Sequence, residues 1–189
     1  MTRVQLRPFY SPEQRAALYS APYKHAKWPE HKFRVAHTAQ ALREMNPASV
    51  ADLSCGDGAV VGQAGLSCPV ILGDITPGHS FTGPIEETVS LIPGVDVFVC
   101  SETLEHVQDP DALLRAIRVT AARLLLTTPD GETHPAKPEW GNHEHYWGWD
   151  TDELASMLEA AGWEPEVPVE VYAPPVDRPY YAYQIWRCK

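Results

Sequence analysis

Ten residues decide the fold of this chain: Ser49-Val50-Ala51-Asp52-Leu53-Ser54-Cys55-Gly56-Asp57-Gly58. They form an apolar run that ends in a carboxylate and passes directly into small, glycine-containing residues. A helix-compatible stretch, Ala59-Val60-Val61-Gly62-Gln63-Ala64, follows. In a strand, tight turn and helix of this kind, main-chain amides and a helix N-terminus point at a bound ligand. Gly56 and Gly58 permit backbone conformations that a side chain forbids, so a cofactor can approach the main chain closely.

A second apolar run supports this interpretation. Residues 69–73 read Pro-Val-Ile-Leu-Gly and end at Asp74. An acidic residue about 20 positions beyond such a loop holds the ribose hydroxyls in nucleoside-binding βαβ units. The loop and Asp74 together therefore predict a nucleoside cofactor.

The remaining pattern alternates strands with helices, which is typical of an open α/β sheet. The last two strands have no helix between them, so we expect an antiparallel hairpin. No internal repeat or linker marks a second domain. The expected strands are 49–53, 70–73, 80–83, 95–100, 122–128, 167–172 and 180–186, and the expected helices are 12–18, 30–45, 86–91, 110–117 and 150–161.

Size and composition fit a single globular domain. The chain has 189 residues, of which 44% are hydrophobic and 21% charged, and that length is sufficient for a core without disulfides. Its four cysteines lack the close spacing of a zinc site, so we expect buried free thiols. The sequence has neither an apolar run long enough to span a bilayer nor an apolar signal core at Met1–Arg7. We therefore expect a soluble cytoplasmic protein.

The charge is spread unevenly along the chain. The net charge of −10 argues against a general nucleic-acid binder, whose affinity comes largely from phosphate neutralisation. Residues 1–45 nevertheless carry eight Lys/Arg against three Glu, a local +5, which leaves −15 for residues 46–189. Two interpretations stay open: a basic arm packed on an acidic body, or a lid that receives an anionic substrate.

Three motifs and the terminal hairpin resemble those of the class I (Rossmann-like) S-adenosylmethionine-dependent methyltransferases. The glycine loop resembles the first motif of that family, and Asp74 matches its ribose-binding acid. The segment Ser101-Glu102-Thr103-Leu104-Glu105-His106-Val107-Gln108-Asp109-Pro110 resembles the stretch after the fourth strand in many small-molecule members. The likeness covers about residues 48–186.

The resemblance implies a Rossmann-like, mostly parallel seven-stranded sheet with helices on both faces. It implies one methyltransferase domain over 1–189, with 1–45 as an N-terminal arm and lid helix, and S-adenosylmethionine as cofactor. Ser54 stands where the family has its first glycine. The residues that the resemblance assigns to the cofactor are Asp52, Ser54, Gly56 and Gly58 for its amino-acid part, Asp74 for the ribose, Pro84 and Ile85 for adenine, Ser101 and Glu102 for its methionine end, and Ile75 beside Asp74.

Three histidines are candidates for contact with the acceptor. His106 follows the fourth strand, where a base with a pKa near neutrality would face the methyl group. The aromatic loop Trp140–Trp149 follows the fifth strand and is expected to form an acceptor-binding wall. Within it, His145 resembles the histidine that many relatives carry before the next helix, and His143 is the second choice. The pattern His143-x-His145 would need further ligands, such as His106 or Asp130, to hold a metal, so we expect none.

The sequence thus predicts an S-adenosylmethionine-dependent methyltransferase that acts on oxygen or nitrogen of a small-molecule acceptor. Nucleic-acid modification is the second hypothesis, because the Asn/Asp-Pro-Pro-aromatic tetrad of flat-amine nucleic-acid methyltransferases is absent from the sequence after the fourth strand. A non-catalytic module that binds the donor is the third. No membrane partner is expected, and the oligomeric state stays open.

Overall fold

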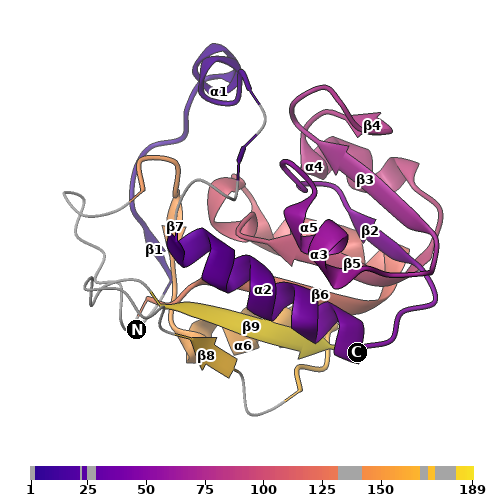
Figure 1. Ribbon diagram of the computed structural model, residues 1–189. Helices are drawn as coiled ribbons and strands as arrows, with labels where there is room; N and C mark the ends of the chain where they lie inside the picture. Colours follow the sequence, from indigo (N-terminus) through magenta and orange to yellow (C-terminus); the bar gives the residue numbers. More distant parts are fainter. Residues whose placement is uncertain (1–2, 22, 25–28, 132–141, 167–169, 173–181) are drawn as a thin grey trace.

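A seven-stranded sheet forms the centre of the molecule (Figure 1). The computed structural model describes residues 3–21, 23–24, 29–131, 142–166, 170–172 and 182–189. The strand order is β4-β3-β2-β5-β6-β9-β8, with the strand of the glycine loop, β2, third from one edge. The strands of this sheet are β2 (Val50–Asp52), β3 (Val70–Asp74), β4 (Phe81–Thr82), β5 (Val95–Ser101), β6 (Ala121–Pro129), β8 (Glu170–Tyr172) and β9 (Tyr183–Cys188).

In the sheet, β4, β3, β2, β5 and β6 pair in parallel, whereas β9 and β8 pair with their neighbours in antiparallel fashion. β6 pairs with β9 in antiparallel register, with Leu126 opposite Trp186, and β9 pairs in the same way with β8. The predicted Rossmann-like α/β sheet with its antiparallel hairpin is therefore confirmed. The connection 173–179 and the outer ends of the predicted hairpin strands lie outside the described residues.

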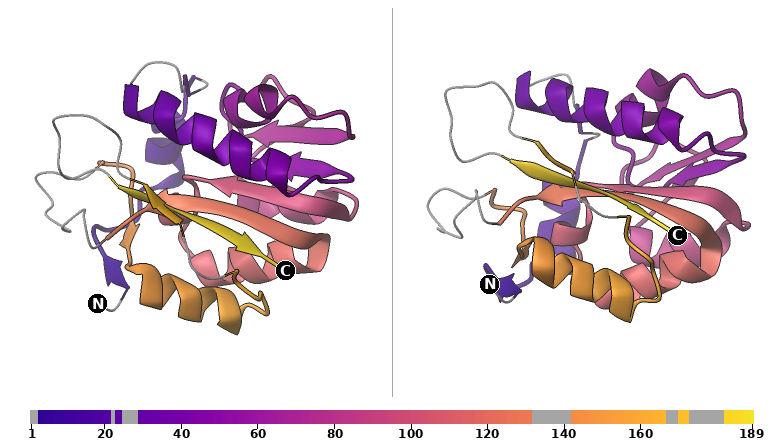
Figure 2. Two further views of the ribbon diagram at one scale, coloured as in Figure 1. Left: turned by 60° about the horizontal axis from the view of Figure 1, so that its bottom comes forward. Right: turned by 90° about the horizontal axis from the view of Figure 1, so that it is seen from below.

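Helices cover both faces of the sheet, as Figure 2 shows from two sides. On one face α2 and α3 pack on the sheet, and on the other α5 and α6 do so; each pair forms its own buried core with the strands. The helices are α1 (Pro12–Leu18), α2 (Pro29–Glu44), α3 (Ala59–Ala64), α4 (Ile85–Thr88), α5 (Pro110–Thr120) and α6 (Thr151–Ala160), with short 3-10 turns η2 (Val89–Leu91) and η3 (Leu104–His106).

Local sequence signals explain where these helices begin. Asp109 caps α5 by accepting a hydrogen bond from Ala112 N, and Pro110 takes the first helical position. Ser11 and Gln14 form a capping box at the start of α1. Asp150 caps α6 by accepting from Glu153 N.

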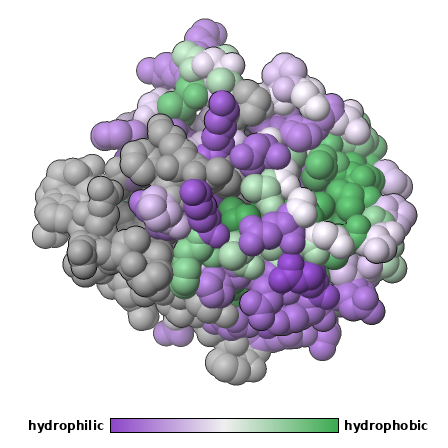
Figure 3. Space-filling view, in the orientation of Figure 1, coloured by the Kyte–Doolittle hydropathy of each residue, from purple (hydrophilic) through white to green (hydrophobic). Residues whose placement is uncertain are grey.

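The strand β3 is less covered than β5. Every residue of β5 except Asp96 is buried, whereas Val70, Ile71 and Leu72 of β3 are only half-buried. The chain after Asp74 turns directly into β4 instead of forming a long helix, which leaves this part of the sheet open. Figure 3 shows hydrophobic residues gathered over β3, beside hydrophilic residues over α2.

The N-terminal arm adds a small second sheet that the sequence did not suggest. β1 (Val4–Gln5) pairs in antiparallel fashion with β7 (Trp147–Gly148). The arm is thereby joined to the loop after β6, far along the chain. In the part of the chain that the structure describes, no helix is both long and apolar enough to cross a membrane. The four cysteines are free thiols, as expected; three of them are buried, whereas Cys68 is only partly buried.

Candidate active site

The glycine loop connects β2 to α3 at the carboxyl edge of the sheet. Gly56 and Gly58 have φ angles of 57° and 74°, in the left-handed region that favours glycine. A Cβ on Gly58 would approach Leu72 no closer than 3.7 Å, so the backbone angle and not the available space requires glycine there. Ser54, which replaces the first glycine of the motif, is not among the residues with positive φ. Its side chain is therefore accommodated without backbone strain.

Asp74 at the end of β3 fixes the shape of this loop. Its Oδ2 accepts a hydrogen bond of 2.8 Å from Gly56 N, while Oδ1 accepts from the amide and hydroxyl of Thr76. His79, in the turn that follows, donates from Nε2 to the Gly56 carbonyl at 2.9 Å. This contact of His79 was not predicted, because nothing in the sequence of its turn indicated a contact with the loop.

Asp52 lies behind the loop. Its carboxylate is 2% exposed and accepts a hydrogen bond of 3.2 Å from Ser54 N. Burial raises the pKa of Asp52 to about 7, with a further contribution from the negative charge of Asp74. Asp52 is thus a carboxyl group that changes charge near neutral pH.

The end of β5 is held by an arginine from α2 that sequence reasoning also missed. Arg34 is 2% exposed and donates from its guanidinium to Ser101 Oγ at 2.7 Å. Its Nε lies 3.9 Å from Glu102 Oε2. Glu102 has a φ of 51°, which is uncommon for a residue with a side chain and is typical of strained functional sites. The only sequence signal for Arg34 was the basic charge of the arm.

A cavity of about 390 Å³ lies above these strand ends. Its volume is in the range of small-molecule sites. The lining does not include Asp52, which lies behind the loop, or Gly58, at the start of α3. The predicted cofactor residues that line it are Ser54, Gly56, Asp74, Ile75, Pro84, Ile85, Ser101 and Glu102.

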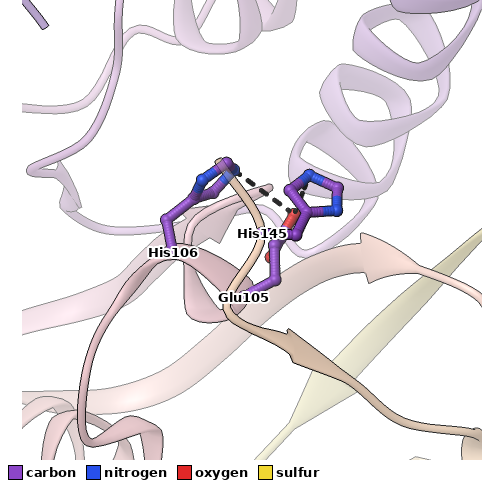
Figure 4. A group of neighbouring side chains, drawn as sticks. All are labelled: Glu105, His106 and His145. Carbon is purple, nitrogen blue, oxygen red and sulfur yellow. Dashed lines mark ion pairs between the residues drawn. The ribbon is translucent and has the colours of Figure 1, made fainter. Parts of the chain in front are cut away.

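His106, which follows β5, and His145, which follows β6, also line this cavity and lie beside the buried Glu105 (Figure 4). The imidazole Nε2 atoms of both histidines lie 3.9 Å from Glu105 Oε1, and their rings meet edge to face with centroids 4.7 Å apart. His106 Nδ1 donates to the carbonyl of Glu144 at 3.0 Å. Burial lowers the pKa of His106 to about 4, so the ring is neutral at physiological pH.

Glu105 is the most deeply buried member of this group. Its side chain is 0% exposed, and Oε2 accepts from Thr128 Oγ1 at 3.2 Å. Oε1 has no hydrogen-bond partner among the described residues. Burial, followed by the charge of Glu102, raises the pKa of Glu105 well above its ordinary range.

His143 is placed differently from the other two histidines. Its side chain is exposed and is absent from the described lining of the cavity. Its carbonyl accepts hydrogen bonds from Arg7 and from the Tyr10 hydroxyl. The backbone at His143 therefore serves to hold the arm. Trp140 and Gly141, the start of the predicted acceptor wall, lie outside the described residues.

The arm closes one side of the cavity. Leu18, Tyr19, Tyr23 and His31 are in its lining, and Tyr19 Oη lies 3.4 Å from His106 Nδ1. Arg15, at the cavity wall, pairs with Glu86 at 3.1 Å. Two further aromatic residues of the arm, His25 and Trp28, lie outside the described residues.

Comparison with sequence families matches residues 25–166 to the methyltransferase domain family. Comparison with curated proteins yields no match. The chain belongs to this methyltransferase family, and its fold is the class I fold of S-adenosylmethionine-dependent methyltransferases. The resemblance described from the sequence is confirmed, as are methyltransferase activity and the S-adenosylmethionine cofactor that define the class.

Three solved structures illustrate the likeness of fold. The small RNA methyltransferase HEN1 is similar with a TM-score of 0.65 and 19% identity, over 84% of this chain but only 25% of that one. The Burkholderia thailandensis 1,6-didemethyltoxoflavin-N1-methyltransferase has a TM-score of 0.64 and 17% identity, over 96% of this chain and 91% of that one. An S-adenosylmethionine-dependent methyltransferase from Archaeoglobus fulgidus has a TM-score of 0.61 and 16% identity, over 85% and 97%.

Proposed function

We propose that this methyltransferase transfers a methyl group from S-adenosylmethionine to oxygen or nitrogen of a small-molecule acceptor. The observation that carries the proposal is a single cavity. The residues of the donor motifs line one end, and His106 and His145 line the other, with the arm between them and the solvent.

The donor end suits a cationic nucleoside. Asp74 holds the ribose hydroxyls, and Ile75, Pro84 and Ile85 form the apolar wall for adenine. Ser54 and Gly56 surround the amino-acid part, and Asp52 and Gly58 support the loop that carries them. Ser101 and Glu102 lie at the methionine end. The carboxylates of Asp74, Glu102 and Glu144 in the lining favour the sulfonium and ammonium charges of the donor.

Methyl transfer is an in-line displacement at the methyl carbon, so the acceptor atom must be held close to it and water excluded. Leu18, Tyr19 and Tyr23 of the arm provide that exclusion. His145 and His106 are the groups that orient the acceptor, with His145 as the first choice for contact and His106 as a neutral hydrogen-bonding ring. His143 is a weaker candidate, because its side chain is exposed.

The placement of the basic residues favours a small acceptor over a nucleic acid. Arg3 pairs with Asp111, Arg15 with Glu86, and Arg34 bonds Ser101. Arg7 donates to three main-chain carbonyls, those of Asn142, His143 and His145. These four guanidinium groups of the arm are engaged within the protein, so they are poorly placed to neutralise phosphates. These four of the eight Lys/Arg in residues 1–45 therefore favour the interpretation of a basic arm packed on the acidic body.

A labelled-methyl assay tests the proposal. Purified protein is incubated with methyl-labelled S-adenosylmethionine and either pooled small metabolites or total RNA. We expect label in small organic products and none in RNA. Label in RNA would favour the nucleic-acid hypothesis that the likeness to HEN1 keeps open. Tight donor binding without turnover in either pool would identify a binding module instead. Asp74→Asn is the matched control for donor-dependent labelling.

A further inference from the structure

We propose that Glu105, His106 and His145 form a binding site for a divalent transition-metal ion that opens on the acceptor end of the cavity. The sequence led to the opposite expectation. The pair His143-x-His145 is not the ligand set, because the His143 side chain is exposed. The fold instead brings His145 to two residues of η3, some 40 positions earlier in the chain (Figure 4).

The geometry of the three side chains is close to that of a metal site. One ligand atom from each residue lies within 4.8 Å of the other two, and both histidine Nε2 atoms are 3.9 Å from Glu105 Oε1. An ion with bonds of about 2.0–2.2 Å holds neighbouring ligand atoms roughly 3.0–3.5 Å apart. Side-chain rotations that bring each histidine closer to Glu105 by about half an ångström, and the two histidines closer to each other by up to roughly 1.5 Å, complete the site.

The buried Glu105 oxygen is the observation that points to a ligand. Oε1 faces both imidazoles, is fully buried, and has no hydrogen-bond partner among the described residues. A buried carboxyl oxygen without a hydrogen-bond partner costs free energy. A bound cation removes this cost, and it gives a reason for burying an acid between two histidines.

Surrounding contacts orient two of the three ligands. His106 donates from Nδ1 to the Glu144 carbonyl, which leaves the Nε2 lone pair turned toward Glu105. Thr128 donates to Glu105 Oε2 and so turns Oε1 toward the histidines. Tyr146 N donates to the Glu105 carbonyl at 2.8 Å and ties the loop of His145 to η3. Hydrogen bonds of this kind fix the ring orientation of metal-binding histidines.

The ligand set selects the class of ion. Two imidazoles and one carboxylate suit Zn²⁺, Co²⁺, Ni²⁺ or Fe²⁺, whereas Mg²⁺ and Ca²⁺ prefer all-oxygen sites. His106 and His145 both line the cavity, so the open coordination positions face the acceptor. The site therefore has the three protein ligands and the vacant face of a catalytic rather than a structural ion.

The role that we assign to the ion rests on the proposed function, with methyl transfer to an oxygen atom of the acceptor. A hydroxyl bound to the ion loses its proton to solvent more readily, because the cation stabilises the alkoxide. The alkoxide oxygen then forms the bond to the methyl carbon, the bond from that carbon to sulfur breaks, and the sulfur keeps the electron pair. No oxidant or reductant is needed.

Titration of chelator-treated protein with Co²⁺ tests the site, read by calorimetry and by the visible absorption of the bound ion. We expect one ion per chain, displaced by Zn²⁺ and not by an equal concentration of Mg²⁺. His145→Ala and Glu105→Gln should each weaken binding by at least about 100-fold, since even loss of an outer contact costs about 10–100-fold. His143→Ala, in the same loop, is the matched control and should bind Co²⁺ like the unmodified protein.

Binding of S-adenosylhomocysteine shows that each variant is folded. Equal Co²⁺ affinity in the unmodified protein, His145→Ala and Glu105→Gln would overturn the proposal, and so would the absence of Co²⁺ absorption bands in folded protein. This experiment needs no acceptor. A metal site in a protein without small-molecule turnover would therefore contradict the proposed function and leave the site standing.

Discussion

The main-chain amide of Gly56 donates a hydrogen bond of 2.8 Å to Asp74 Oδ2. This bond joins the two motifs that the sequence presents separately, the glycine loop after β2 and the acid after β3. Asp74 thus has two tasks in the proposed site. One carboxylate oxygen holds the loop in its shape, and the carboxylate also lines the cavity, where we propose that it binds the ribose hydroxyls.

Asp74→Asn should weaken donor binding by roughly 10–100-fold, which corresponds to the loss of a hydrogen bond to a charged acceptor, about 1.5–3 kcal/mol. The amide keeps the shape of the side chain but presents a nitrogen that cannot accept from Gly56 or from a ribose hydroxyl. Calorimetric titration with S-adenosylhomocysteine measures the change. Glu87→Gln, an exposed acid on α4, serves as the control. Donor affinity that is the same in both variants would exclude Asp74 from the site.

Donor affinity should depend on pH through Asp52. The pKa of this carboxyl is about 7 in the free protein, because of burial and the neighbouring Asp74, while Arg34 acts in the opposite direction. A cationic donor favours the ionised form, so binding should strengthen as pH rises toward 8. It should weaken roughly tenfold for each pH unit below 7. Dissociation constants between pH 5.5 and 8.5 test this, and Asp52→Asn should flatten the profile.

The same carboxyl should make the free protein less stable at alkaline pH. Its folded-state pKa of about 7 lies above the ordinary value of 3.8, so the folded state binds the proton more tightly than the unfolded chain. The resulting stability is fully present below pH 4 and is lost as pH rises through 7, at about 1.4 kcal/mol per pKa unit. Urea unfolding at pH 5 and pH 8 measures it. Asp52→Asn should reduce the difference in the free energy of unfolding between these two pH values. If that difference is unchanged in the variant, other titratable groups cause it.

Replacement by alanine should change the stability of the fold in opposite directions at two glycines. A Cβ on Gly131 would lie 2.2 Å from the Trp149 carbonyl oxygen, so Gly131→Ala should destabilise the fold by about 1–3 kcal/mol. Gly62 is exposed inside α3, with nothing within 4 Å of a Cβ. Gly62→Ala should therefore stabilise it by about 0.5–1 kcal/mol. Urea unfolding of both variants checks the pair, and a loss of stability in Gly62→Ala would contradict the described backbone of α3.

Much of the fold was predictable because the signals are local. The apolar run of β5, the capping residue Asp109 and the glycines of the loop each encode their own structure, and these elements lie close to where the sequence predicted them. The pairing of β1 with β7 was not predictable, because two-residue strands carry no periodicity and meet only through the tertiary fold. The same is true of Arg34, whose burial beside Ser101 depends on how α2 crosses the strand ends.

The arrangement of the two candidate histidines was likewise only partly predictable from the sequence. Their positions after β5 and before α6 were sufficient to select His106 and His145 from the sequence. That both Nε2 atoms lie near the buried Glu105 follows from tertiary contacts, which the sequence pattern does not encode.

Arg7→Ala should loosen the loop that carries His145. The Arg7 guanidinium donates to the carbonyls of Asn142, His143 and His145, at 2.6–3.0 Å. We expect the KM for the acceptor to rise about tenfold, equivalent to about 1.4 kcal/mol, with a smaller change in donor affinity. Arg43→Ala is the matched control, because Arg43 also binds a main-chain carbonyl, that of Gln63, but is not part of the cavity lining. Equal acceptor KM in both variants would remove the arm from acceptor binding.

In the proposed site, donor and acceptor meet in one cavity, and a crystal structure with S-adenosylhomocysteine tests this arrangement. We expect ribose hydroxyls on the Asp74 carboxylate, adenine against Ile75 and Pro84, and the sulfur turned toward His106 and His145. A nucleoside bound away from Asp74, or a sulfur facing away from the two histidines, would contradict it.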